Sequence, residues 1–242
     1  NRQKQAFNIL NGVSLRIKPG EVVALLGHNG SGKSTLIKCI VGVIKPTKGN
    51  VSINGKNSFK YRKQLVFDYG VIFNQKPSFL IDLSVEDNLK FFKSLYNLSE
   101  QKFNEAFTEI DAFLDVKALL KRQYRKLSFG ERVKCEITSI LLHKPKLIVL
   151  DEPTIGLDYK AKEGVYSLLK HFNETYNATI LITTHEVDYL EGFCHKAIIL
   201  KNGSIEYMGN PAAISKAMKD KMNIKFQYEA ITNEGLALTI LA

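Results

Sequence analysis

Three glycines and a lysine stand at a spacing that suits phosphate binding. The pattern G-x-x-x-x-G-K-[ST] is matched in full by a run that comprises Gly27, His28, Asn29, Gly30, Ser31, Gly32, Lys33, Ser34 and Thr35. Glycine reaches positive φ without strain, so the backbone can turn several N–H groups towards one anion. Lys33 adds a positive charge for the β- and γ-phosphates, and the Ser34 hydroxyl can ligate a bridging Mg²⁺. The run predicts a phosphate-binding loop; a glycine-rich turn with a solvated lysine is the structural alternative.

A pair of carboxylates follows a second apolar run. Residues 147–150 are wholly apolar and are followed at once by Asp151 and Glu152. This pattern predicts a buried strand whose C-terminal end carries both acids, and open α/β sheets bind their ligands at that end. Asp151 can hold Mg²⁺ directly or through water, and Glu152 can orient or deprotonate an attacking water molecule. The alternative is a turn with two solvated acids.

Two further positions are informative only beside these motifs. Ser128 and Glu131 have the spacing of a capping box, so they mark a helix N-terminus that could accept an anion. Alone they indicate no more than the start of a helix. His185 follows the strand predicted at 179–183 and lies at its C-terminal edge. A lone histidine at such a place is more often structural than catalytic.

The elements that must hold these residues alternate between strand and helix. Residues 22–26 form a short apolar run after a Pro-Gly turn, and residues 34–40 carry apolar side chains at helical spacing. The phosphate-binding loop therefore joins a buried strand to a helix. Further strands are expected at 13–17, 51–53, 69–73, 147–153 and 179–183, with a closing hairpin at 197–200 and 204–208.

Between residues 84 and 141 the pattern changes to helix. Ser84 and Asp87 have capping-box spacing ahead of an amphipathic stretch that contains Leu89, Phe91, Phe92 and Leu95. A second stretch runs from Ser99 to Leu114, with Phe103, Phe107, Ile110 and Leu114 expected to point inward. These aromatic stripes are interpreted as core rather than as a cofactor site. One more helix is expected from 159 towards 176, and a basic helix at about 211–221 precedes a tail without a motif.

Composition places the chain among ordinary globular proteins. It has 242 residues, of which 45% are hydrophobic and 24% charged, and its apolar runs are too short to span a bilayer. No secretory signal opens the chain, although the first residue, Asn1, suggests that the true start is missing. Three widely spaced cysteines, Cys39, Cys135 and Cys194, are expected to be reduced and mostly buried, as in a cytosolic protein.

The formal net charge of +10 is compatible with nucleic acid, with an anionic membrane face, or with the loops of membrane proteins. The densest basic cluster consists of Lys117, Lys121, Arg122, Arg125 and Lys126. It contains one aromatic residue and no RNA-binding signature. A solvated basic face is the simpler interpretation.

Taken together, these motifs resemble the ATP-binding cassette (ABC) ATPases, in particular the nucleotide-binding subunit of an ABC transporter. The resemblance covers nearly the whole chain and follows the order of the family. It rests on the phosphate-binding loop, Gln75, the signature sequence 127–131, the Walker B end at Asp151 and Glu152, Asp158 in the D-loop, and His185 as the switch histidine.

The resemblance implies an α/β fold. Its core is a P-loop NTPase with a mainly parallel sheet, joined by a small antiparallel β subdomain and an inserted α-helical subdomain. A single nucleotide-binding domain would fill residues 1–242. Its core lobe would comprise about 1–75 and 143–210, its helical subdomain about 76–142, and its C-terminal tail 211–242.

The family also implies a head-to-tail dimer that encloses two ATP molecules. The signature residues Ser128, Phe129, Gly130 and Glu131 would face the γ-phosphate held by the partner copy. Glu152 would be the general base and His185 would contact the γ-phosphate. Mg²⁺ would be held by Ser34, Gln75 and Asp151, and Gln75 would also be catalytic. The implied partners are a second copy of the subunit and membrane permease subunits, which would dock on the helical subdomain at the cytoplasmic face of the membrane; no nucleic acid is expected.

The signature sequence departs from the family pattern. The usual Leu-Ser-Gly-Gly-Gln is here Leu-Ser-Phe-Gly-Glu. Ser128 and Gly130 are kept, whereas Phe129 and Glu131 stand at positions that are looser in the family. Function is expected to be retained.

The adenine-stacking aromatic is a second departure. Family spacing points near Lys4, which is not aromatic. Phe7 is the closest aromatic, and a residue before Asn1 is the alternative.

The favoured function is an ATPase that powers a membrane transporter. The stretches 71–75 and 142–158 resemble bacterial exporter subunits, which favours export. A soluble ABC ATPase acting on the ribosome or on DNA is the alternative, although such relatives carry two cassettes or a long coiled coil, and this chain has neither pattern. A P-loop kinase would leave the signature sequence and His185 without a role. The transported substrate cannot be inferred from this chain.

Overall fold

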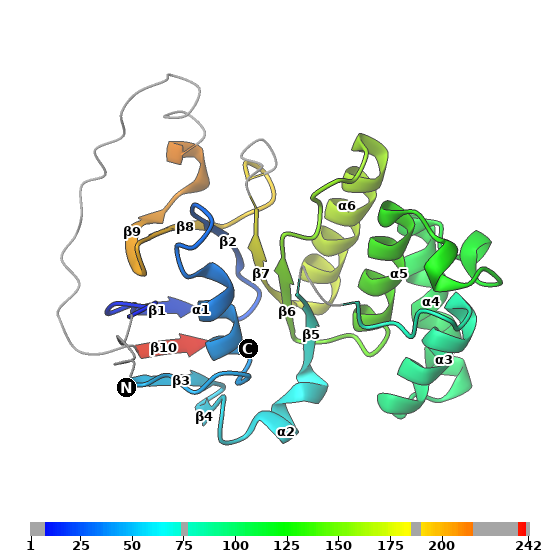
Figure 1. The fold of residues 1–242 in the computed structure, drawn as a ribbon, viewed down its shortest axis with the longest axis horizontal. Helices are drawn as coiled ribbons and strands as arrows, with labels where there is room; N and C mark the ends of the chain where they lie inside the picture. The colour runs from blue at the N-terminus through cyan, green and yellow to red at the C-terminus, as the bar shows by residue number, and fades with distance from the viewer. Residues whose placement is uncertain (1–7, 74–76, 185–189, 215–236, 241–242) are drawn as a thin grey trace, which may run out of the picture.

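A central parallel sheet organises the computed structural model, which describes residues 8–73, 77–184, 190–214 and 237–240. Its six strands lie in the order β5-β6-β7-β2-β8-β9 (Figure 1). Only the β8–β9 pair at one edge is antiparallel. The strand bounds are β2 Val22–Leu26, β5 Tyr69–Ile72, β6 Leu147–Asp151, β7 Thr179–Thr183, β8 Lys196–Lys201 and β9 Ser204–Gly209. The expected mainly parallel sheet is confirmed.

The inner strands are buried on both faces. In β2, Val23 and Leu25 join one apolar cluster, whereas Val22, Ala24 and Leu26 join another on the opposite face. Successive side chains of a strand point to opposite faces, so a strand covered on both sides must be apolar throughout. The unbroken apolar runs in the sequence have this cause.

A smaller sheet and the helices cover the two faces. The small sheet has the order β1-β10-β3-β4, and only its β3–β4 pair is antiparallel. It lies at one end of the molecule in Figure 1, and helices α3 and α4 lie at the other. The strands are β1 Leu15–Ile17, β3 Asn50–Ile53, β4 Lys56–Asn57 and β10 Ala237–Ile240; the helices are α1 Lys33–Ile40, α2 Arg62–Leu65, α3 Val85–Leu95, α4 Glu100–Leu114, α5 Phe129–Leu141 and α6 Tyr159–Tyr176.

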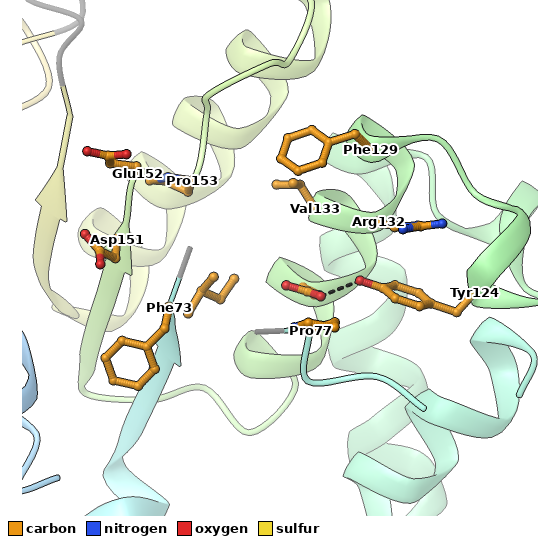
Figure 2. A pocket seen from close by; sticks show the side chains of 11 residues that line it. Phe73, Pro77, Tyr124, Phe129, Arg132, Val133, Asp151, Glu152 and Pro153 are labelled. Atoms are coloured by element: carbon orange, nitrogen blue, oxygen red, sulfur yellow. Dashed lines mark hydrogen bonds between the residues drawn. The ribbon is translucent and has the colours of Figure 1, made fainter. Parts of the chain in front are cut away.

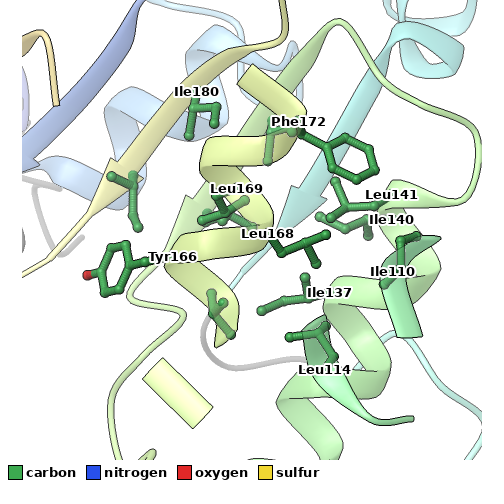
Figure 3. Packing of buried hydrophobic residues seen from close by; sticks show 14 of the residues in the cluster. Ile110, Leu114, Ile137, Ile140, Leu141, Tyr166, Leu168, Leu169, Phe172 and Ile180 are labelled. Atoms are coloured by element: carbon green, nitrogen blue, oxygen red, sulfur yellow. The ribbon is translucent and has the colours of Figure 1, made fainter. Parts of the chain in front are cut away.

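Helices α4, α5 and α6 pack around one apolar cluster (Figure 3). Phe172 and Leu168 of α6 meet Ile137 and Leu141 of α5, and all four are fully buried. Ile110 of α4 lies in the same cluster. This packing fixes the position of α5, and with it the signature sequence at the N-terminus of α5, relative to the sheet.

Several details of the helices differ from expectation. Ser84 caps α3 by accepting the Asp87 N–H, but the Asp87 side chain accepts from the Ser84 hydroxyl instead of completing a capping box. Asp is one methylene shorter than the Glu of a capping box. Leu89 is buried in the core as expected. Phe91 and Leu95 are each 50% exposed, so these two side chains of the amphipathic stretch lie outside the core.

The C-terminal region also differs from expectation. The sequence beyond the expected basic helix carries no motif, yet 237–240 forms strand β10 between β1 and β3. The basic helix expected at 211–221 begins at residue 211, and its part from 215 onward lies outside the described residues.

His143 connects three of these elements and carries a depressed pKa. Its Nε2 donates to the carbonyl of Tyr69 at 3.0 Å, and its ring stacks on Tyr96 with centroids 3.8 Å apart. Nδ1 is buried without a hydrogen-bond partner in the described part of the chain. Burial lowers the pKa of His143 to about 4, because a second proton would place a charge in an apolar setting.

We expect His143 to make stability sensitive to acid. The unfolded chain binds a proton on this side chain near pH 6.5 and the folded chain only near pH 4, so the contribution is present above pH 6.5 and is lost as the pH falls towards 4. In His143→Gln, the drop in melting temperature between these pH values should be smaller than in the unmutated protein. His28→Gln, at an exposed histidine, should keep the full drop. Equal drops in all three proteins would contradict the assignment.

Candidate functional site

The phosphate-binding loop connects the end of β2 to the start of α1, as the sequence predicts. The N-cap residue of α1 is Gly32, with φ 108°, so no side chain caps this helix and its first turn carries no acidic residue. The first N–H groups of a helix have no partner within the helix, and they carry its positive end. An uncapped start without a nearby acid is the arrangement that best suits an anion.

The loop is fixed against the neighbouring hairpin. Gly27 has φ 147°, and a Cβ atom placed there would lie 2.3 Å from the carbonyl oxygen of Leu200 in β8. Gly203, in the β8–β9 turn, donates its N–H to the carbonyl of Ser31 at 3.0 Å. Glycine at 27 is therefore required by both the backbone angle and the close approach of β8.

Lys33 lies across the inside of the loop. Its Nζ donates to the carbonyl oxygens of Gly27 at 2.6 Å and His28 at 3.3 Å. The same Nζ is 4.0 Å from Oε1 of Glu152, and the Lys33 side chain is 6% exposed. The loop and the second predicted carboxylate thus meet around one ammonium group.

Asp151 ends β6 and accepts two hydrogen bonds. Its Oδ2 accepts from the Ser34 hydroxyl at 2.8 Å, and its Oδ1 accepts from the Thr183 hydroxyl at 2.7 Å. The backbone N–H of Glu152 donates to the same Thr183 oxygen at 2.8 Å. Glu152 has φ 55°, in the left-handed region that few residues other than glycine adopt. The loop serine, both acids and Thr183 therefore form one connected set.

The oxygen atoms of this set fit a hard divalent cation. Ser34 Oγ and Asp151 Oδ2 are adjacent, and Mg²⁺ prefers oxygen ligands. Among the described residues there is no group of three or more His, Cys, Asp or Glu side chains that could enclose a metal. Mg²⁺ usually completes its shell with phosphate oxygens and water. The side chains present agree with a cation that is shared with a phosphate.

Two cavities adjoin this set. A cleft of about 660 Å³ is lined by Ile9, Asn29, Gly30, Gly32, Lys33, Ser34, Thr35, Lys38, Phe73, Asp151 and Glu152. A smaller cavity of about 210 Å³ shares Phe73 and the two acids (Figure 2). Across the smaller cavity, Phe129 and Val133 come from α5, and the Tyr124 hydroxyl donates to Glu136. The larger cleft carries the loop and is the candidate nucleotide site.

The signature residues start α5 outside the larger cleft, and Phe129 lines the smaller cavity that also contains the two acids. The Ser128 hydroxyl accepts from the Glu131 N–H at 3.3 Å and the Glu131 carboxylate accepts from the Ser128 N–H at 2.7 Å, which confirms the predicted capping box. This hydrogen bond from Ser128 lowers the pKa of Glu131. Phe129 is 53% exposed and lies over Gly156. None of the four signature residues is among the described residues that line the larger cleft.

The remaining predicted site residues divide into two groups. Asp158 caps α6 by accepting the Ala161 N–H at 2.8 Å, so its carboxylate already has a structural role. Gln75, His185, Lys4 and Phe7 lie outside the described residues. The three cysteines are free; Cys39 and Cys135 are buried and Cys194 is half-buried.

Thr183 is the site residue that motif reading did not single out. It ends β7 beside Asp151, in the register Asp151 to Thr183. The available signal was the polar residue at the C-terminal end of this strand, the end at which open α/β sheets bind their ligands.

The family model described as ABC transporter matches residues 10–155. The chain belongs to the ABC transporter ATP-binding family. A putative ABC transporter ATP-binding protein of Archaeoglobus fulgidus is 35% identical over 217 residues, which cover 85% of this chain and 88% of the relative. A putative ABC transporter ATP-binding protein of Caldanaerobacter subterraneus is 33% identical over 225 residues, which cover 93% of this chain but 39% of that relative's length. The family inferred from the sequence motifs is confirmed.

Further similarity extends to energy-coupling factor proteins. The energy-coupling factor transporter ATP-binding protein EcfA2 of Clostridioides difficile is 30% identical over 226 residues, covering 90% of this chain and 77% of the relative. The structure of cbiO1 from Clostridium perfringens, part of the ABC transporter complex cbiONQ, is 30% identical with a TM-score of 0.75, covering 90% and 89% of the two chains. These ABC relatives do not support the expected export direction, which stays a prediction.

Solved ABC cassettes include dimers. One is a dimeric structure of a post-hydrolysis state bound to ADP and Pi, with a TM-score of 0.77 and 27% identity, covering 87% of this chain and 94% of that chain. The expected fold class, a P-loop ATPase of mixed α/β structure, is confirmed by this similarity. In the described part of this ABC chain, no helix is long and apolar enough to cross a membrane.

We expect Gly27→Ala to destabilise the protein strongly. The new Cβ would clash with the Leu200 carbonyl, and the backbone would be held at an unfavourable φ. Gly12→Ala is the matched control, because Gly12 also has positive φ but has no atom within 4 Å of an added Cβ. Strain from the positive φ, about 1–3 kcal/mol, is present in both variants, but only Gly27→Ala adds the clash, so it should unfold at a clearly lower denaturant midpoint than Gly12→Ala. Equal midpoints would contradict the close approach of β8.

Proposed function

We propose that this chain is the ATP-hydrolysing, energy-coupling subunit of an ABC transporter. The observation that carries the proposal is the connected set at one sheet edge, in which Ser34 and Thr183 bond to Asp151 while Lys33 lies beside Glu152. A phosphate-binding loop and two acids in this arrangement supply the groups that phosphoryl transfer to water requires. Membership of the ABC family supports the same chemistry.

The loop residues bind and orient the nucleotide in this proposal. The uncapped start of α1 donates N–H groups to the phosphates, and Lys33 exchanges its loop carbonyls for phosphate oxygens. Ser34 and Asp151, with Gln75, would hold Mg²⁺, which neutralises charge on the phosphates when it is bound. Glu152 is the general base for the attacking water, and its carboxylate lies 4.0 Å from Lys33 Nζ.

A second copy completes the site in this proposal. Ser128 starts a helix and does not line the larger cleft of its own chain, so in this proposal it would serve the γ-phosphate of a partner copy. Dimeric solved cassettes support this arrangement. Asp158 and His185 would act at the same interface. The pair would bind membrane permease subunits through the helical subdomain at about 76–142, as a peripheral complex on the cytoplasmic face.

Two substitutions test this function. Lys33→Ala should abolish ATP binding, because the loop loses its phosphate cation. Glu152→Gln should bind Mg-ATP normally and lower kcat at least about 100-fold, the scale of a lost general base. Nucleotide affinity and phosphate release would be measured for both, with Glu163→Gln, an exposed carboxylate of α6, as the control at full activity. Unchanged turnover of Glu152→Gln, or an unmutated protein that releases no phosphate, would refute the proposal.

The acidic residue in the signature generates a further prediction. Glu131 places a negative charge at the N-terminus of α5, where the proposal puts the partner's γ-phosphate. Glutamine keeps an oxygen for the Ser128 N–H but removes the charge. A charge at a helix terminus is worth about 0.3–1 kcal/mol and the dimer has two such sites, so Glu131→Gln should tighten ATP-dependent dimerisation about 3- to 30-fold.

The comparison is best made in a Glu152→Gln background, where ATP would not be turned over. The dimer dissociation constant would be taken from light scattering over a range of protein concentrations. Glu163→Gln, which removes an equal charge from the exposed face of α6, should leave the constant unchanged. A weaker dimer in Glu131→Gln would mean that the carboxylate does not face the phosphate.

A further inference from the structure

Thr183 lies between the two strands that carry the predicted chemistry. Strand β7 separates β2, which leads into the phosphate-binding loop, from β6, which ends in the acids. Thr183 pairs in register with Leu25 on one side and with Asp151 on the other. Its side chain is fully buried, with 0% exposure. A hydroxyl in this place must form hydrogen bonds with its neighbours, because water cannot reach it.

Both bonding capacities of the Thr183 hydroxyl are used at the site. It donates its proton to Oδ1 of Asp151 at 2.7 Å and accepts the N–H of Glu152 at 2.8 Å. Since Oδ1 is bonded in this way, the other oxygen, Oδ2, is the one turned to Ser34. The hydroxyl therefore orients the Asp151 carboxylate and the Glu152 backbone together.

Glu152 needs this support because its backbone is strained. At φ 55° the Glu152 backbone lies in the left-handed region, which residues other than glycine disfavour. The left-handed turn also takes the Glu152 N–H out of the strand pattern, and Thr183 supplies its acceptor. The same turn places the Glu152 carboxylate beside Lys33.

We infer that Thr183 is a positioning residue for ATP hydrolysis: its hydroxyl holds Asp151 and Glu152 in their reactive orientations. This inference rests on the proposed function. The hydroxyl acts through the two acids and does not itself touch the nucleotide. Packing does not explain the residue, because valine has the same shape as threonine and would fill the same space between the strands.

Thr179 provides an internal comparison. It lies four residues earlier in β7, on the same face of the sheet, and is also fully buried. Its hydroxyl accepts the N–H of Gly20 at 3.1 Å, at the opposite end of the strand from the acids. Removing this hydroxyl leaves the part-buried N–H of Gly20 unpaired and does not touch the site.

The experiment compares Thr183→Val with Thr179→Val. Leaving buried partners unpaired costs about 1–3 kcal/mol, which corresponds to about 5- to 150-fold in rate when it falls on the transition state. We expect Thr183→Val to lower kcat by that factor with the KM for ATP within about threefold of normal. Thr179→Val should lose comparable thermal stability but keep kcat within about threefold. Thr183→Ser should keep most of the activity.

A readout apart from activity addresses the orientation of Asp151. Mn²⁺ binding to the protein with a non-hydrolysable ATP analogue, followed by electron paramagnetic resonance, should be weaker in Thr183→Val and unchanged in Thr179→Val. Thr183→Ala against Thr183→Ser gives a second pair that differs only in the hydroxyl, should Thr183→Val fail to fold.

The outcomes separate this inference from the proposed function. If the unmutated protein is active and Thr183→Val has the same kcat, the role of Thr183 is overturned but the proposed function is not. The same holds if Thr183→Ala has the same kcat as Thr183→Ser. An equal loss of kcat in Thr179→Val would also overturn it, because the effect would then be general destabilisation. An unmutated protein without phosphate release would instead refute the ATPase assignment.

Discussion

The parallel pairing of β6, β7 and β2 is the constraint on which the site depends. Parallel strands end at the same edge of a sheet, and the register aligns Asp151, Thr183 and Leu25 across that edge. The phosphate-binding loop begins two residues after Leu25, so it must emerge beside the acids. Both faces of the sheet are covered by other elements, so the three strands must be mainly apolar to lie side by side in its centre.

Two helix starts in this protein have opposite electrostatic designs. Helix α1 begins at Gly32 without a side-chain cap, which leaves its N–H groups to a ligand. Helix α5 begins with a complete capping box, and its own carboxylate, Glu131, satisfies one of its first donors. An anion can approach α1 directly, whereas at α5 it must compete with Glu131 and meets Phe129 on an exposed surface. In a composite site, the N-terminus of α1 would therefore bind an anion more strongly than the N-terminus of α5.

Local patterns in the sequence predicted much of this structure. The bounds of α6 and β7 and the cap of α5 agree residue for residue with the apolar periodicity and the Ser128–Glu131 spacing. The exposure of Phe91 and Leu95 was not predictable from α3 alone. The width of the buried face of a helix depends on the neighbouring elements that cover it, and the helix sequence does not specify them. Strand β10 was missed because its partners, β1 and β3, lie at the other end of the sequence. The bonds of Thr183 were missed for the same reason: they depend on which strands become neighbours.

The central claim is that one chain supplies the phosphate-binding loop and acids while a second copy supplies the signature helix. Light scattering of Glu152→Gln with and without Mg-ATP tests it most directly, because slow turnover would preserve the nucleotide-bound assembly. The account predicts a mass near 27.3 kDa without nucleotide and twice that value with it. A protein that binds ATP tightly and stays at the monomer mass across the accessible concentrations would contradict a site completed by a second copy of this chain.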